Sequence, residues 1–375
     1  MNGKKPLMNY RRVQKLQTPL LLSGALLSGV GTSVSIPLVI LGIAIMLFAI
    51  VIGVLYYRCP HCGMPLGRIG DSVAYCPHCG KALDAPVEEP VCSISVPAYA
   101  KLNLTLDILG KRDDGYHEMK MVMQTISLHD DVTVTLTDKG ITCRIAGAEL
   151  PRDERNLAVK AANAFCEAMD YRGGIDIALI KRIPSEAGMA GGSADAAAVL
   201  RALRDLVSPA LTDKRLEQIG GGRIGSDVPF CICGGTQLAE GRGEKLTVLN
   251  PAPECFVAVC KPDFPISTPA LFARVDGVML SNRPDTGAML SAIARGDCGA
   301  LCANVQNVFE QALPDAQRER IEEIKRALVE NGAACAAMTG SGSAVFGLFS
   351  DEVLCRNACE VLQGDRVETF FAEFV

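Results

Sequence analysis

The residues of this chain that are best suited to chemistry form a glycine-rich turn. The turn consists of Pro184, Ser185, Glu186, Ala187, Gly188, Met189, Ala190, Gly191, Gly192, Ser193 and Ala194. Its glycines allow phosphate oxygens to approach the backbone, and a following helix adds free N–H groups and the positive end of its dipole. Taken alone, the turn is consistent with either phosphate binding or tight packing.

Two other nucleotide-binding patterns are excluded. No Gly-Lys-Ser or Gly-Lys-Thr follows the turn, so it is not a Walker loop. Gly220, Gly222 and Gly225 have the Gly-x-Gly-x-x-Gly spacing, but they follow a predicted helix, residues 212–219, rather than a strand. We therefore do not expect a dinucleotide site there.

A second group of reactive side chains is a pair of Cys-x-x-Cys motifs. Cys59 and Cys62 form the first pair, and Cys76 and Cys79 form the second. Two thiolates from each pair can complete a tetrahedral site, so the sequence predicts a structural Zn²⁺ ribbon over residues 58–83. The alternative is a thiol–disulfide redox pair, which usually has a single such motif. Residues 84–91, rich in proline and acidic side chains, are predicted to be a linker.

An uncharged run covers residues 18–57. About 20 apolar residues cross a bilayer, so this run suits two short spans, which we place at residues 19–30 and 37–57 with a turn between them. The basic N-terminus, residues 1–17, and the basic residues after the run favour a hairpin with both ends in the cytoplasm. A signal peptide is the alternative, but its apolar core would be shorter. We expect a multi-pass protein of the bacterial cell membrane with its zinc ribbon and C-terminal region on the cytoplasmic side.

The elements that position the glycine-rich turn are mixed strands and helices. The net charge of −5 and the absence of tryptophan give no indication of nucleic-acid binding. Alternating and apolar runs predict strands, and alanine-rich or 3.6-residue patterns predict helices. The predicted strands are 93–96, 102–109, 132–136, 141–145 and 175–180, and the predicted helices are 156–169 and 194–206.

Residues 184–198 resemble the phosphate loop of the GHMP kinases, and residues 97–104 and 338–343 resemble the first and third motifs of that superfamily. Within it, further segments are similar to those of the 4-diphosphocytidyl-2-C-methyl-D-erythritol kinases. These segments are Gly110–Glu118, Ile224–Phe230, Ala239–Glu244, Ile266–Phe272 and Asn307–Glu310. Tyr99 is an extra residue before Lys101 in the first motif, which leaves the strand register open.

The resemblance implies ATP-dependent phosphorylation of the 2-hydroxyl of 4-diphosphocytidyl-2-C-methyl-D-erythritol, a step of the non-mevalonate isoprenoid route. It implies that Asp227 is the base and Lys101 its charged partner. It places Asn156 and Lys181 near adenine, and it implies that Mg²⁺ accompanies ATP. The residues that it implies for the cytidyl substrate are Asn103, Tyr116, His117, Thr268 and Phe272.

The implied fold is α+β, with a ribosomal S5-like subdomain at residues 92–243 and a ferredoxin-like subdomain at residues 244–375. Two alternatives remain at this point. One is a GHMP kinase for another small alcohol, and the other is an inactive, membrane-tethered binding protein with the same fold. The sequence does not indicate the oligomeric state.

Overall fold

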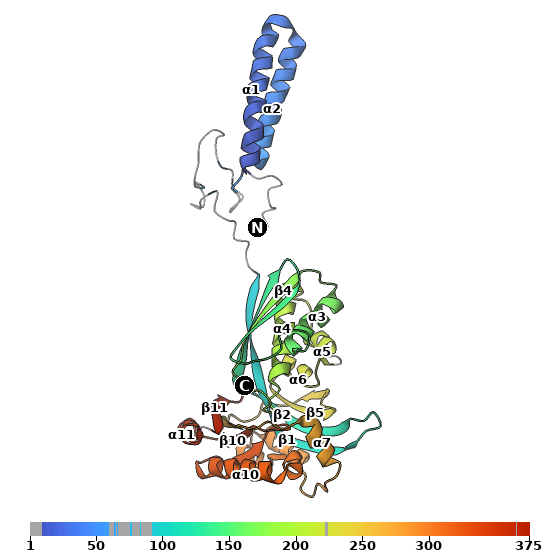
Figure 1. Ribbon diagram of the computed structural model, residues 1–375, viewed down its shortest axis with the longest axis vertical. Coiled ribbons are helices and arrows are strands. Elements are labelled where there is room, and N and C mark those ends of the chain that lie inside the picture. The colour runs from blue at the N-terminus through green and yellow to red at the C-terminus, as the bar shows by residue number, and fades with distance from the viewer. Residues whose placement is uncertain are drawn as a thin grey trace. The chain divides into compact units, whose positions relative to one another are not determined.

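The computed structural model describes residues 10–59, 64, 66, 76, 83, 92–221, 224–364 and 366–375. The chain divides into two compact units, Met1–Val91 and Cys92–Val375 (Figure 1). The break lies where the predicted linker meets the region that resembles a kinase.

The first unit contains a helical hairpin (Figure 1). Helix α1 (Tyr10–Val34) and helix α2 (Ile36–Tyr56) are joined at Ser35, which has an extended backbone. The predicted first span, residues 19–30, is therefore part of a longer helix, and the predicted turn shortens to one residue. Pro37 lies in the first turn of α2, where its missing N–H costs no hydrogen bond, and this favours a helix start at Ile36.

Small residues bring the two helices of the hairpin close together. A Cβ on Gly42 would lie 2.6 Å from the carbonyl oxygen of Gly24 and 2.3 Å from Ser28 Oγ, so neither glycine leaves room for a side chain. This close approach is common between membrane helices. Among the described residues, one segment, Ile36–Gly53, is long and apolar enough to cross a membrane.

The second unit contains a large sheet that carries helices on one face (Figure 1). Among the described residues the sheet has seven strands in the order β3-β4-β2-β1-β8, with β5 pairing β2 and β6 pairing β5. The strands are β1 (Ser93–Lys111), β2 (His117–Thr137), β3 (Ile141–Ala146), β4 (Gly174–Ile180), β5 (Thr236–Gly241), β6 (Lys245–Val248) and β8 (Gln306–Asn307). Strand β6 lies after Gly243, the predicted end of the first subdomain, and pairs with β5 in this sheet.

The helices of this subdomain are α3 (Leu157–Met169), α4 (Gly191–Val207), α5 (Asp213–Gly221) and α6 (Val228–Cys233). Helix α4 packs directly on β1 and β2. Its alanine-rich face, including Ala194, Ala196 and Ala197, is almost fully buried. Small side chains allow the helix to lie close to the sheet, and this fixes the position of the turn that precedes it.

The second subdomain is built on an antiparallel sheet in the order β11-β7-β10-β9. Its strands are β7 (Phe256–Pro262), β9 (Cys335–Met338), β10 (Val345–Phe349) and β11 (Val367–Glu373). Its helices are α7 (Thr268–Val275), α8 (Thr286–Arg295), α9 (Cys298–Ala303), the 3₁₀ helix η1 (Val308–Ala312), α10 (Asp315–Glu330) and α11 (Glu352–Leu362). The predicted α+β class with two subdomains is confirmed.

The two predicted N-terminal strands of this unit form one continuous strand, β1. Its pairing with β2 shifts between Tyr99, which faces His129, and Lys101, which faces Thr125. Two residues of β1 thus span four of β2, so the irregularity adds residues to β2 and not to β1. The strand continues through Tyr99, and both Lys101 and Asn103 remain buried along it.

Candidate active site

The glycine-rich turn connects β4 to α4 and is held by a second turn, residues 339–343, from the other subdomain. The N–H groups of Ser343 and Ala344 donate to the carbonyl oxygens of Glu186 and Ala187, each at 3.3 Å. At Gly188 the φ angle is +74°, and a Cβ there would lie 2.2 Å from the carbonyl oxygen of Thr339. Position 188 thus requires glycine for two reasons: its φ angle is positive, and the backbone of Thr339 leaves no room for a side chain.

The N-terminus of α4 opens into a cavity of about 370 Å³. The predicted turn residues from Pro184 to Ser193 line it, together with Asn156 and Lys181, whereas Ala194 is buried in the first turn of α4. Asn156 caps α3, because its Oδ1 accepts from the N–H of Ala158 at 2.9 Å. Its Nδ2 donates to the carbonyl oxygen of Pro151 at 2.9 Å. Asn156 therefore shapes the wall of this cavity.

Lys181 lies in a buried ionic cluster beneath the turn. Its Nζ is 2.5 Å from Asp130 Oδ2 and 2.6 Å from Asp195 Oδ2. Asp130 Oδ1 also accepts from the N–H of Ile183 at 2.9 Å, so the cluster ties β2 to the start of the turn. Burial raises the pKa of Asp195 to about 7, although the Lys181 ammonium opposes this shift. Both aspartates escaped the sequence analysis, since only the fold brings them to Lys181.

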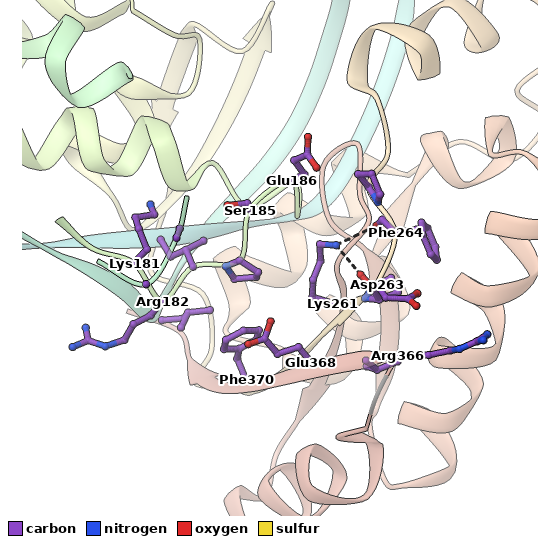
Figure 2. Close-up of a pocket in the computed structure, with 18 of the residues that line it drawn as sticks. Lys181, Arg182, Ser185, Glu186, Lys261, Asp263, Phe264, Arg366, Glu368 and Phe370 are labelled. Atoms are coloured by element: carbon purple, nitrogen blue, oxygen red, sulfur yellow. Dashed lines mark hydrogen bonds between the residues drawn. The ribbon is translucent and has the colours of Figure 1, made fainter. Parts of the chain in front are cut away.

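A wider opening of about 760 Å³ adjoins the same segment, as Figure 2 shows. Lys181, Ser185 and Glu186 line it from one side, and Lys261 and Phe264 line it from the other (Figure 2). Lys261 Nζ donates to the carbonyl oxygens of Pro262 at 2.7 Å and Phe264 at 3.1 Å. The ammonium is thus occupied by backbone acceptors, and burial lowers the pKa of Lys261.

A cleft of about 930 Å³ is lined by both members of the predicted catalytic pair, Lys101 and Asp227. Lys101 lies on β1 and is 4% exposed, and its Nζ donates to Asn103 Oδ1. Burial lowers the pKa of Lys101, and the charges of Asp227 and Cys231 oppose that shift. Asp227 precedes α6, and its side chain makes no capping hydrogen bond. Asp227 lines the cleft together with Lys101.

The other end of the cleft holds the predicted base-binding residues. The rings of His117 and Phe272 stack with centroids 4.7 Å apart and an angle of 23° between their planes. Tyr116 is 58% exposed, and the guanidinium of Arg242 lies over its ring at 4.7 Å from the centroid. Thr268 Oγ1 is 2.6 Å from Ser341 Oγ, on the turn that holds the phosphate loop. The cleft thus contains a group of aromatic residues together with Lys101 and Asp227.

Asn307 supports the floor of the cleft. Its Nδ2 donates to the carbonyl oxygens of Met338 at 2.7 Å and Gly340 at 2.8 Å, and its Oδ1 accepts from the N–H of Phe309 at 3.0 Å. These bonds fix the turn at residues 339–343. Asn307 lies in a segment that resembles the kinase family, but its supporting role depends on contacts that the sequence does not predict.

The predicted zinc site lies mostly outside the described residues. Cys59 and Cys76 are described and are buried with Tyr57, Leu66 and Leu83 in a small apolar cluster. Cys62 and Cys79 are outside the described residues. In the described parts of the chain, no group of three or more histidine, cysteine or acidic side chains is arranged to hold a metal ion. The zinc site stays a prediction.

Comparisons with known families match two segments of the second unit. The GHMP kinases N terminal domain matches residues 156–235, and the GHMP kinases C terminal domain matches residues 289–363. The first match contains the glycine-rich turn and Asp227.

Individual relatives match over most of this chain. A 4-diphosphocytidyl-2-C-methyl-D-erythritol kinase of Clostridium tetani is 42% identical over 282 residues, which are 75% of this chain and 100% of the relative. The corresponding protein of Brevibacillus brevis is 43% identical over 272 residues, which are 72% of this chain and 92% of the relative.

Solved structures agree with these sequence matches. A crystal structure of 4-(cytidine 5'-diphospho)-2C-methyl-D-erythritol kinase is 32% identical, with a TM-score of 0.64 over 75% of this chain and 99% of that one. Homoserine kinase from Cytophaga hutchinsonii has a TM-score of 0.60 at 19% identity, with 77% of this chain and 96% of that one covered. The latter likeness concerns the fold alone.

Proposed function

The chain belongs to the 4-diphosphocytidyl-2-C-methyl-D-erythritol kinases, and from this premise we propose that it transfers the γ-phosphoryl group of ATP to the 2-hydroxyl of that substrate. The observation that carries the proposal is the arrangement of the 930 Å³ cleft. Lys101 and Asp227 line it together with the aromatic residues Tyr116, His117 and Phe272. The product belongs to the non-mevalonate route to isoprenoids.

The catalytic pair acts by positioning and by charge. Phosphoryl transfer passes through a loose transition state, so the proton of the attacking hydroxyl leaves late and a carboxylate is basic enough to receive it. Asp227 accepts this proton. Burial lowers the pKa of Lys101 and the charge of Asp227 opposes that shift, and the Lys101 ammonium donates to developing negative charge.

The glycine-rich turn and the N-terminus of α4 receive the phosphates of ATP. Their N–H groups need no side-chain charge to bind an anion. Mg²⁺, when bound, neutralises the phosphate oxygens. The Ser193 hydroxyl lines the nucleotide cavity and is an oxygen donor suited to that ion, which usually keeps most of its contacts with phosphate and water.

Replacement of Asp227 by asparagine tests the catalytic assignment. We expect turnover in a coupled ADP-release assay to fall by about 10²–10⁴-fold, because the variant keeps the size of the side chain but cannot accept the proton. The matched control is Asp205→Asn. Asp205 is exposed on α4 and forms an ion pair with Arg204, so this variant should keep its turnover. Near-normal turnover of Asp227→Asn would refute the role of Asp227.

The two alternatives predict different results in the same assay. A kinase for another alcohol would release ADP with other substrates but not with the cytidyl one. An inactive binding protein would release none. The combination of aromatic base-binding residues with the buried Lys101 favours the proposed substrate over both alternatives.

For the N-terminal unit we propose a membrane hairpin followed by a zinc ribbon, with the kinase unit on the cytoplasmic side of a bacterial cell membrane. The proposal is supported by the uncharged run at residues 18–57, by the apolar segment Ile36–Gly53 and by the two Cys-x-x-Cys pairs. The deletion of residues 1–91 should release the protein from the membrane fraction and keep its turnover. Metal analysis of the intact protein should find one zinc ion for each chain, and a metal-free protein would refute the ribbon.

A further inference from the structure

Asp276 lies at the aromatic end of the cleft, outside every motif that the sequence analysis quoted. It directly follows α7 and lines the cleft together with Lys111, His117 and Phe272. Its Oδ1 is 2.7 Å from His117 Nε2, and its Oδ2 is 2.7 Å from Lys111 Nζ. One carboxylate thus joins a histidine at the start of β2 to a lysine at the end of β1.

The contacts of Asp276 determine which nitrogen of His117 carries the proton. The Lys111 ammonium and the His117 ring both lower the pKa of Asp276, so the carboxylate is ionised and can only accept hydrogen bonds. His117 Nε2 must therefore donate to it. In the neutral imidazole the other nitrogen, Nδ1, is then an acceptor.

The environment of the ring holds this orientation. Phe272 stacks on the His117 ring, and Phe309 packs edge-on against Phe272 with centroids 4.9 Å apart. His117 is thus held by Asp276 at one edge and by Phe272 across one face. No hydrogen bond to Nδ1 is found among the described residues, which leaves this nitrogen for a ligand in the cleft.

We propose that Asp276 is a positioning residue that makes His117 Nδ1 a hydrogen-bond acceptor and thereby selects a cytosine over a uracil base. Cytosine presents an amino group at its 4-position, which donates to Nδ1. Uracil presents a carbonyl oxygen at the same position, so two acceptors would face each other and the base would be rejected. The inference rests on the proposed function, since it concerns the base of that substrate.

Asp276→Ala tests the inference in the full-length protein. The variant should raise the KM for the cytidyl substrate about tenfold, because the hydrogen bond to Nε2 is charge-assisted. It should leave kcat and the KM for ATP within about twofold, since Asp276 forms its hydrogen bonds with Lys111 and His117 and not with Lys101, Asp227 or the glycine-rich turn. Asp276→Glu, which restores an acceptor, should recover part of the affinity, and Asp205→Asn is the matched surface control.

Base selection provides the readout that a purely structural role would not change. Binding of cytidine 5'-diphosphate and uridine 5'-diphosphate, measured by calorimetry, should differ by at least about 100-fold in the unmodified protein. The difference should fall below about tenfold in Asp276→Ala. Circular dichroism should show that the variant keeps its fold.

Two results separate this inference from the proposed function. If the unmodified protein prefers the cytidine nucleotide and Asp276→Ala keeps the whole preference, the role of Asp276 is refuted and the kinase assignment stands. If the unmodified protein binds both nucleotides equally, base selection itself is refuted, whatever the turnover.

Discussion

Gly188 offers a sharp test of how the phosphate loop is held, through the substitution Gly188→Ala. The φ angle of +74° there is unfavourable for alanine by about 1–2 kcal/mol. The new Cβ would also lie 2.2 Å from the carbonyl oxygen of Thr339, whereas ordinary contact begins at 3.4 Å. The phosphate loop and the turn at residues 339–343 must therefore separate by about 1.2 Å.

This displacement determines the expected loss of activity. A shift of about 1 Å in groups that position a substrate can cost about 10²-fold in rate. Together, the backbone term and the steric term should lower the free energy of unfolding by about 2–4 kcal/mol. We expect kcat/KM to fall at least 100-fold, with ATP binding weakened as well, because the loop moves as a unit.

The assay is ADP release coupled to NADH oxidation, with thermal unfolding followed by circular dichroism. Gly140→Ala is the matched control, because its φ angle is +79° and no atom lies within 4 Å of the added Cβ. That variant should carry the backbone cost alone, about 1–2 kcal/mol, with turnover within about twofold of the unmodified protein. If Gly188→Ala is as active as Gly140→Ala, the loop does not depend on the contact with Thr339.

Two further predictions concern the supports of the site. Asn307→Ala removes three buried hydrogen bonds, so it should lower the free energy of unfolding by about 3 kcal/mol and raise the KM for both substrates. An unchanged melting temperature and unchanged KM values would contradict the supporting role of Asn307. Asp195 has a pKa of about 7 in the folded protein and near 3.8 in the unfolded chain. Between about pH 4 and pH 7 the folded state therefore binds a proton that the unfolded chain has released. The stability of the unmodified protein relative to Asp195→Asn should therefore fall as the pH rises from about 4 to 7, and a difference in melting temperature that is flat across this range would contradict the shift.

The sequence predicted those parts of the molecule that depend on local pattern. The strand at residues 175–180, the alanine-rich helix and the turn between them are present with small changes of boundary. The α+β class and the presence of Lys101 and Asp227 in one cleft also agree with what the motifs implied. Local spacing predicts the strand, the helix and the turn, because glycine, alanine and apolar residues act within a few positions of one another. The fold class and the pairing of Lys101 with Asp227 followed from the resemblance to the GHMP kinases.

Long-range partners could not be predicted in the same way. Asp276 meets His117 across 159 positions of sequence, and no spacing rule connects them. The cluster of Lys181 with Asp130 and Asp195 likewise depends on how β2, β4 and α4 pack together. The continuous β1 was missed because Tyr99 interrupts the alternation, while the compensating extra residues lie on β2.

Incubation of the full-length protein with ATP, Mg²⁺ and 4-diphosphocytidyl-2-C-methyl-D-erythritol, followed by ³¹P NMR, tests the central claim most directly. We expect one phosphomonoester group on the 2-hydroxyl of the cytidyl substrate for each ADP formed, and no phosphomonoester signal with Asp227→Asn. Release of ADP without this phosphomonoester, or no reaction by a folded protein that binds both substrates, would contradict it.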